Sequence, residues 1–313
     1  MILTLAGGVG GAKLANGFAK VCSPDDLLIG VNIGDDFIHF GLHISPDLDS
    51  VMYRLAGLND QERGWGLADE SWNFMRSIAR LGGPEWFNLG DHDLATHMER
   101  TRLLGLGKTL SEVTVHLSQA LGVKHHIAPV SNEKIRTKVK TANGDLSFQD
   151  YFVRMRCEPE VRGFIYEGAE HARLLPSIEI AVASSNLQAI VICPSNPFVS
   201  IEPILAIPAL RELLITRRAP CIAVSPIIEG KAVKGPAAKM MRELGLRSSS
   251  YTIARYYKGL IDGLVIDRAD ENEQGRISKE GIRTLVTGTL MPDSQAEEAL
   301  ARQVLAFSSK LRS

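Results

Sequence analysis

The chain has 313 residues, of which 45% are hydrophobic and 23% charged, and its net charge at pH 7 is −1. This composition is typical of a globular protein, and the near-neutral charge excludes a basic field that would attract nucleic acid or anionic lipid. No apolar run reaches the roughly 18 residues of a membrane span, and the start lacks the basic region of a signal peptide. The four cysteines form no CxxC pair, so we expect free thiols in a reducing cytoplasm.

The first thirteen residues, MILTLAGGVGGAK, predict a buried strand, a glycine-rich turn and a helix that opens at Lys13. The turn contains four glycines: Gly7, Gly8, Gly10 and Gly11. Backbone N–H groups of such a turn face an anion over the helix N-terminus, most often a phosphate. Leu14 stands where a Walker A loop needs Ser or Thr, and the third glycine of the dinucleotide pattern is absent. The alternative is a tight connection without a ligand.

Four further apolar runs rich in β-branched residues predict buried strands at residues 27–32, 189–193, 221–224 and 263–266. Because helical stretches separate these runs, we expect a three-layer, Rossmann-like α/β fold with a mainly parallel sheet. A single nucleotide-binding domain would span residues 1–313.

Residues 55–120 predict a helical insertion within this domain, with helices near 72–79, 94–103 and 110–121. Further along, residues 134–157 predict a β-hairpin around the Asn143-Gly144 turn signal. The apolar spacing over residues 278–307 predicts a C-terminal helix.

A polar segment, NIGDDFIHFGLHISPDLDS at residues 32–50, follows the second strand. It holds four aspartates and two histidines: Asp35, Asp36, Asp47, Asp49, His39 and His43. Ligands of open α/β sheets bind at the carboxyl ends of the strands, and carboxylates suit Mg²⁺ shared with a substrate phosphate. The alternatives are that Asp47 caps a helix beginning near Leu48, and that the histidines are core or hydrogen-bonding residues.

Three later segments have both a functional and a structural interpretation. Within residues 86–93 (WFNLGDHD), the aromatics are core or line a site for a flat ring, and Asp93 is expected to cap a helix from Leu94. Residues 193–197 (CPSNP) form a plain turn or a rigid loop that recognises a base or sugar. Residues 225–239 carry three lysines, which suit a diphosphate or form a solvated charge run.

These motifs together resemble the 2-phospho-L-lactate transferases of coenzyme F420 biosynthesis. The resemblance rests on GGVGGAKL, NIGDDFIHFGLHISPDLDSVMYRLAGL, WFNLGDHDLATH, CPSNPFVSIEPIL and VSPIIEGKAVKGPAAKMM, and runs in order from residue 1 to about residue 305. It implies that a phospho-acid moiety passes from its guanosine diphosphate adduct to the ribityl hydroxyl of the deazaflavin Fo. The reaction releases GMP and needs Mg²⁺.

The resemblance implies Fo contacts at Asp49 and Asn88, and the motifs described above, interpreted together with it, give the other expected roles. Asp49 and Asp36 are expected to be catalytic, and Asp47, Asp49 and Asp36 to bind the metal. The Fo contacts are expected at Asp49, Asn88, Asp91 and His43. The nucleotide and phosphate contacts are expected at Gly7, Gly8, Gly10, Gly11, Lys13, Ser195, Asn196, Lys231 and Lys234.

The chain departs from relatives at a few of these positions. Asn88 stands where Lys or Arg is frequent, and His92 where Arg is frequent, and we expect these differences to alter how Fo or the donor acid is held. Val9 and Ala12 stand where Thr and Pro are common, although Gly7, Gly8 and Gly10 are kept.

The donor acid stays open among phospholactate, phosphoenolpyruvate and 3-phosphoglycerate, because a pocket discriminates weakly between small groups, by roughly 1–3 kcal/mol per methylene. The resemblance implies a homodimer. One alternative is a nucleotide-sugar-binding regulatory protein of the gluconeogenesis-factor type, which would keep the glycine turn and lack the Fo site. A second is an NAD-dependent oxidoreductase, against which the absent third glycine argues.

Overall fold

The structure of the protein, a computed structural model, describes residues 1–312 and is built on a seven-stranded parallel sheet. The strand order is β14-β13-β10-β9-β1-β2-β5. The strands are β1 (Ile2–Ala6), β2 (Leu27–Val31), β5 (His126–Pro129), β9 (Ala189–Ile192), β10 (Cys221–Val224), β13 (Gly263–Asp267) and β14 (Arg283–Thr287). Every residue of β1, β2, β9 and β10 is buried, as expected for parallel strands covered on both faces. The predicted α/β fold is confirmed.

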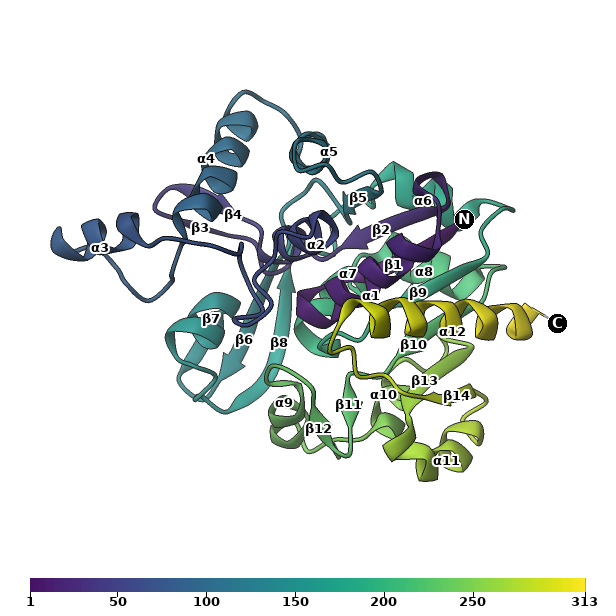
Figure 1. The fold of residues 1–313 in the computed structure, drawn as a ribbon. Helices are drawn as coiled ribbons and strands as arrows, with labels where there is room; N and C mark the ends of the chain where they lie inside the picture. Colours follow the sequence, from purple (N-terminus) through teal and green to yellow (C-terminus); the bar gives the residue numbers. More distant parts are fainter. Residues whose placement is uncertain (313) are drawn as a thin grey trace.

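Helices cover both faces of this sheet (Figure 1). On one face, α1 (Gly8–Val21) lies between α12 (Ser294–Arg312) and α2 (Pro46–Ala56) and packs against both. The opposite face carries α6 (Pro176–Ala183), the short α7 (Glu202–Leu205) and α8 (Pro208–Thr216). Helix α11 (Gln274–Ser278) packs against β14 and contacts α10 (Ser250–Tyr256), whereas α9 (Ala237–Glu243) contacts β8 (Val161–Glu167) and β12 (Lys231–Ala232).

The segment between β2 and β5 holds most of the predicted insertion. It contains the hairpin of β3 (Phe37–His39) and β4 (Leu42–Ile44), then α2, α3 (Asn73–Arg80), α4 (Asp91–Gly105) and α5 (Leu110–Ala120). Helices α3 and α4 project away from the central sheet (Figure 1). The predicted helices at 72–79, 94–103 and 110–121 correspond to α3, α4 and α5.

Two smaller β elements flank the carboxyl edge of the sheet. An antiparallel sheet joins β7 (Gly144–Ser147), β6 (Arg136–Thr141) and β8 (Val161–Glu167), and its β6–β7 hairpin matches the prediction around Asn143-Gly144. A short hairpin pairs β11 (Ile227–Ile228) with β12 (Lys231–Ala232). Among the helices of residues 1–312, none combines the length and apolarity that a membrane span requires.

Two predicted helix positions are wrong. Helix α1 begins at Gly8 and not at Lys13, so three of the four glycines lie inside its first turn. The expected C-terminal helix at 278–307 is interrupted, because residues 283–287 form β14 beside β13, and α12 begins only at Ser294. The β-branched residues of RTLVT favour an edge strand, and tertiary pairing with β13 overrides the weak helical spacing.

Candidate functional site

The candidate site lies where β1 and β2 end, at the carboxyl edge of the sheet. Three chain segments meet there, after β1, β2 and β9. The Ser195 Oγ donates to the carbonyl of Gly7 at 2.7 Å, and the Asn32 side chain donates to the carbonyl of Val199 at 3.3 Å. This is the edge at which open α/β sheets bind their ligands.

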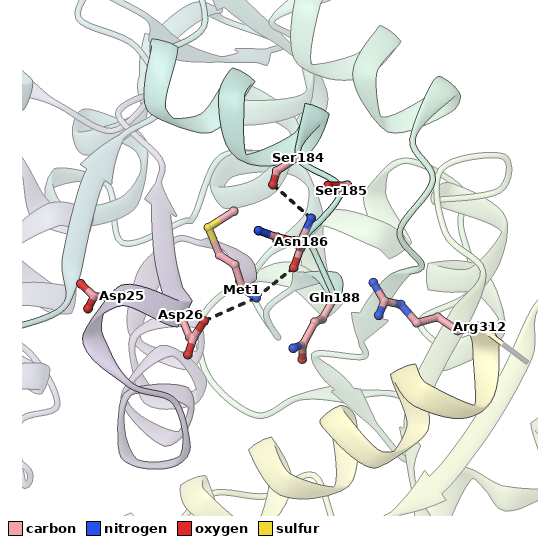
Figure 2. Close-up of a pocket in the computed structure, with 8 residues that line it drawn as sticks. All are labelled: Met1, Asp25, Asp26, Ser184, Ser185, Asn186, Gln188 and Arg312. Carbon is pink, nitrogen blue, oxygen red and sulfur yellow. Dashed lines mark hydrogen bonds and ion pairs between the residues drawn. The ribbon is translucent and has the colours of Figure 1, made fainter.

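A hollow of about 540 Å³ lies at the opposite, amino edge of the sheet (Figure 2). It surrounds Met1, whose ammonium donates to the Asn186 carbonyl at 3.0 Å and lies 3.7 Å from Asp26. Apart from Arg312 at the end of α12, its lining residues precede β1, β2 and β9, so it faces away from every polar motif of the sequence. The fold therefore favours the carboxyl edge as the functional one.

The N-terminus of α1 is occupied by a carboxylate of the chain itself. Gly8, at φ +60°, donates its N–H to Asp47 Oδ1 at 2.7 Å, and Asn32 donates to Asp47 Oδ2 at 2.9 Å. Asp47 lies in the first turn of α2, where Ser45 is the N-cap, so Asp47 caps α1 rather than its own helix. Burial raises the pKa of Asp47 to about 6, although the bonds from Asn32 and Gly8 oppose the rise.

The glycines around this cap permit close packing. A Cβ on Gly7 would lie 2.8 Å from Asp47 Oδ2, and one on Gly11 would lie 2.7 Å from Ser195 Oγ. A Cβ on Gly10 would overlap the carbonyl oxygen of Pro194. The glycines thus bring α1 against Asp47 and the loop after β9, which accounts for residues of poor helix propensity in a first turn.

We expect Gly10→Ala to destabilise the fold by about 1–3 kcal/mol, because backbone atoms on both sides must shift. The matched control is Gly105→Ala at the end of α4, where an added Cβ meets no atom within 4 Å. Its stability should equal or exceed that of the wild type. Urea unfolding midpoints test this pair, and equal midpoints for both variants would contradict the packing argument.

Asp35 and Asp36 join Asp47 in one buried acidic cluster. Asp36 Oδ2 accepts from Ser45 Oγ at 2.9 Å and lies 3.1 Å from His43 Nε2. Burial, followed by the charges of Asp47 and Asp36, raises the pKa of Asp35 well above its usual range. Within residues 1–312, Oδ1 of Asp35 and Oδ1 of Asp36 are both buried without a hydrogen-bond partner. A hard divalent cation would satisfy such oxygens and relieve the repulsion.

Asp49 is held differently, by a buried network from helix α4. Both of its oxygens accept from the Arg100 guanidinium, and His97 Nδ1 lies 3.6 Å from Asp49 Oδ2. His97 Nε2 lies 3.4 Å from Asp93, which in turn accepts from the Tyr53 hydroxyl at 2.6 Å. Burial raises the pKa of Asp49, while Arg100 and His97 partly offset it.

This network contains residues that the sequence interpretation missed. Asp93, His97 and Arg100 are spaced i, i+4 and i+7, so they share one face of α4, and this spacing is visible in the sequence. The prediction that Asp93 caps a helix from Leu94 is wrong, because α4 begins at Asp91 with Gly90 as its N-cap. Nothing in the sequence pairs Asp49 with Arg100.

Of the residues expected to contact Fo, the structure brings His43 to Asp36 and Asp49 to Arg100. Asn88 is exposed. Asp91 accepts from the Ser71 hydroxyl at 2.5 Å and from the Phe74 N–H at 2.9 Å, and these bonds, Ser71 first, lower its pKa. Its carboxylate therefore serves the N-terminus of α3.

The aromatic side chains next to Asn88 pack on the β3–β4 hairpin. The Phe37 and Phe87 rings meet edge to face at 4.8 Å, and the His39 and Trp86 rings at 5.1 Å. Trp86 and Phe87 are only half-buried. The rings therefore belong to a small satellite core, as one of the two sequence interpretations expects, and a role in lining a site for a flat ring stays a prediction.

The expected nucleotide contacts lie around this edge with partners of their own. Lys13 Nζ donates to the Met291 carbonyl at 2.7 Å, and Lys234 Nζ donates to the Gly64 carbonyl at 3.2 Å. Neither lysine forms an ion pair with another side chain of residues 1–312, and both line a pocket of about 130 Å³. Lys231 is exposed on β12.

The loop after β9 is ordered by its own side chains. Besides the bond from Ser195 to Gly7, the Asn196 side chain accepts from the Phe198 N–H at 3.0 Å. The same side chain reaches the Met240 sulfur at 3.3 Å. Ser195 and Asn196 therefore both stabilise the shape of this loop.

Comparison with known proteins identifies relatives along the whole chain. The family model described as 2-phospho-L-lactate transferase CofD matches residues 2–304. A phosphoenolpyruvate transferase of Streptomyces griseus subsp. griseus is 38% identical over 99% of both chains. A 2-phospho-L-lactate transferase of Methanosarcina mazei is 35% identical and covers 97% of this chain and 99% of its own.

A solved structure supports the fold. A UPF0052 family protein from Bacillus halodurans superimposes with a TM-score of 0.60, covering 97% of this chain and 98% of its own at 12% identity. At that identity the likeness concerns architecture alone. The family match and the sequence relatives above do not favour the regulatory-protein or oxidoreductase alternatives.

Proposed function

This chain belongs to the CofD family of 2-phospho-L-lactate transferases, and from that premise we propose the reaction that its carboxyl edge performs. The protein transfers a phospho-acid moiety from its guanosine diphosphate adduct to the ribityl hydroxyl of Fo, in coenzyme F420 biosynthesis. The acid is lactyl or enolpyruvyl, as the names of the relatives specify for those proteins. The observation that carries the proposal is the buried carboxylate cluster beside the N-terminus of α1.

In the proposed reaction, the terminal hydroxyl oxygen of Fo attacks the phosphorus that bears the acid. The new O–P bond forms as the bond to the GMP oxygen breaks, and Asp49 accepts the hydroxyl proton. Asp49 suits this role because it is buried and its orientation is fixed by Arg100 and His97. Such transfers depend on positioning and charge neutralisation more than on covalent catalysis.

We propose that Asp36 and Asp47, with Asp35, hold a Mg²⁺ ion together with oxygens of the substrate diphosphate. Among the described residues, the three acidic and histidine side chains whose ligand atoms already lie within 4.8 Å of one another are Asp49, Asp93 and His97. Oδ1 of Asp35 and Oδ1 of Asp36 are buried without a hydrogen-bond partner among the described residues, and the three carboxylates repel one another, so a cation is favoured there. The two Asp47 oxygens already accept from Gly8 and Asn32. Asp49, a third expected ligand, has both oxygens on Arg100, so we assign it to the proton instead. When bound, Mg²⁺ neutralises charge on the diphosphate.

We propose that three lysines bind the phosphate of the GMP half of the donor: Lys13, Lys231 of β12, and Lys234 just after β12. Lys231 and Lys234 have ammonium groups without a carboxylate partner among the described residues, so they can offset phosphate charge. Ser195 and Asn196 would contact the guanosine.

We also propose that the protein is a homodimer in the cytoplasm, as the family resemblance implies. Light scattering on the purified protein tests the dimer.

Mg²⁺ binding should strengthen as pH rises through about 6, because Asp47 must lose its proton. In the metal-free protein the same raised pKa has the opposite effect on folding. The folded state then binds the proton more tightly, so stability falls as pH rises from about 4 to about 6. Thermal melts at pH 5 and pH 7, with and without Mg²⁺, measure both trends. In Asp47→Asn both should flatten, and an unchanged pH slope in that variant would exclude Asp47 as the source.

The proposed function is tested by incubating the protein with Fo and each guanylylated acid, with product masses as the readout. We expect one acid to give an Fo adduct together with GMP. Absence of any adduct, combined with binding of a nucleotide sugar, would support the regulatory alternative instead.

A further inference from the structure

Arg100 is the most deeply buried charged side chain near the candidate site. It is 1% exposed and lies on α4, while its partner Asp49 lies on α2, 51 residues earlier. The guanidinium donates to both Asp49 oxygens, and its Nη1 also lies 3.1 Å from His97 Nδ1 and 3.4 Å from the His43 carbonyl. One side chain therefore contacts α2, α4 and the β3–β4 hairpin.

A gain in folding stability does not by itself account for burying the Arg100–Asp49 ion pair. Removing two charges from water costs several kcal/mol per ion, and their attraction rarely exceeds what apolar residues of the same volume would provide. A guanidinium does, however, fix the plane of a carboxylate, because its two parallel N–H groups match both oxygens. A second lone pair on each oxygen stays free for another donor.

A second residue of α4 approaches the same Asp49 oxygen, Oδ2, as Arg100 Nη1 does. His97 lies against Asp49 and is itself held by Asp93, which accepts from Tyr53. Each of these residues is buried. The orientation of the Asp49 carboxylate is thus determined by α4, an element outside the central sheet.

We propose that Arg100 is a positioning residue that orients Asp49 for the transfer reaction, and so makes turnover depend on the docking of α4. The inference rests on the proposed role of Asp49 and adds a residue that acts only through it. Misplacing a catalytic group by about 1 Å can cost roughly 100-fold in rate. Arg100 should therefore affect kcat much more than the KM of either substrate.

The experiment compares Arg100→Met and Arg100→Lys, alone and combined with Asp49→Asn. We expect Arg100→Met to lower kcat by about 10- to 100-fold with KM values within about threefold. Arg100→Lys keeps the charge but loses the two-pronged contact, so it should recover part of kcat. In the Asp49→Asn background, Arg100→Met should lower kcat less than about threefold further, because the two residues act as one unit.

Arg217→Met is the matched control, since the Arg217 side chain is also buried and paired, with Asp262 just before β13. Its thermal midpoint should fall as that of Arg100→Met does, while kcat stays near wild type. If Arg100→Met does not fold, Arg100→Lys and its combination with Asp49→Asn decide the question. A wild-type kcat in the Arg100 variants, or fold-losses that multiply with that of Asp49→Asn, would overturn the inference. If instead Asp49→Asn alone keeps wild-type kcat, the proposed role of Asp49 fails first.

Discussion

Asp49→Asn is expected to lower kcat by about 100- to 1000-fold, the loss of about 3–4 kcal/mol typical for removing one preorganised electrostatic partner. Asn keeps the shape of the side chain but neither carries the charge nor accepts the proton of the Fo hydroxyl. It also leaves the buried Arg100 without its counterion. Initial rates of GMP release at saturating substrates measure the effect.

The matched control for this substitution is Asp25→Asn. Asp25 is an exposed aspartate in the hollow at the amino edge of the sheet (Figure 2), and its substitution should leave kcat unchanged. A kcat of Asp49→Asn within about threefold of wild type would remove Asp49 from the reaction. Asp36, whose Oδ1 is buried without a partner among the described residues, would then become the candidate proton acceptor.

Removal of divalent cations is expected to stop turnover, with a loss of about 1000-fold or more, because metal neutralisation supplies several kcal/mol to phosphoryl transfer. Added Mg²⁺ should restore the rate. Asp36→Asn should raise the Mg²⁺ concentration needed for half-maximal rate by at least about tenfold, since a carboxylate ligand becomes neutral.

The Mg²⁺ titration distinguishes ligands from other acidic residues. Asp91→Asn serves as the comparison, because the Asp91 carboxylate is engaged with the N-terminus of α3. Its Mg²⁺ requirement should match the wild type, whatever its effect on Fo. A chelated enzyme that turns over normally, or an Asp36→Asn variant with an unchanged requirement, would contradict the proposed metal site.

The central strands were predictable because burial on both faces leaves a continuous apolar run, as in β1 and β9. The edge strands β5 and β14 were not, because an edge strand tolerates residues such as Pro129 and Arg283 that interrupt the pattern. The start of helix α1 at Gly8 was also not predictable from the sequence pattern. Its glycines lower helix propensity, and only the close approach of Asp47, Pro194 and Ser195 in the folded protein explains them.

The candidate site was predictable to the extent that it follows one strand in sequence. Asp36, Asp47 and Asp49 come from the segment after β2, and the sheet topology alone places them at its carboxyl edge. The residues that hydrogen-bond to these aspartates cannot be predicted from the local sequence pattern. Arg100 reaches Asp49 through the packing of α4, and Gly8 reaches Asp47 through the packing of α1 on α2.

The central position of β1 determines when this protein can become active during its synthesis. β1 is the first strand made, yet its neighbour β9 pairs Ala189 with Ile2, so one edge of β1 stays open until about three fifths of the chain, 189 of 313 residues, exists. The bond from Ser195 to Gly7 forms later still. Long-range pairings of this kind form slowly and leave strand edges exposed meanwhile. A ribosome-bound chain that ends before residue 189 therefore lacks the site, although it already contains every aspartate of the acidic cluster.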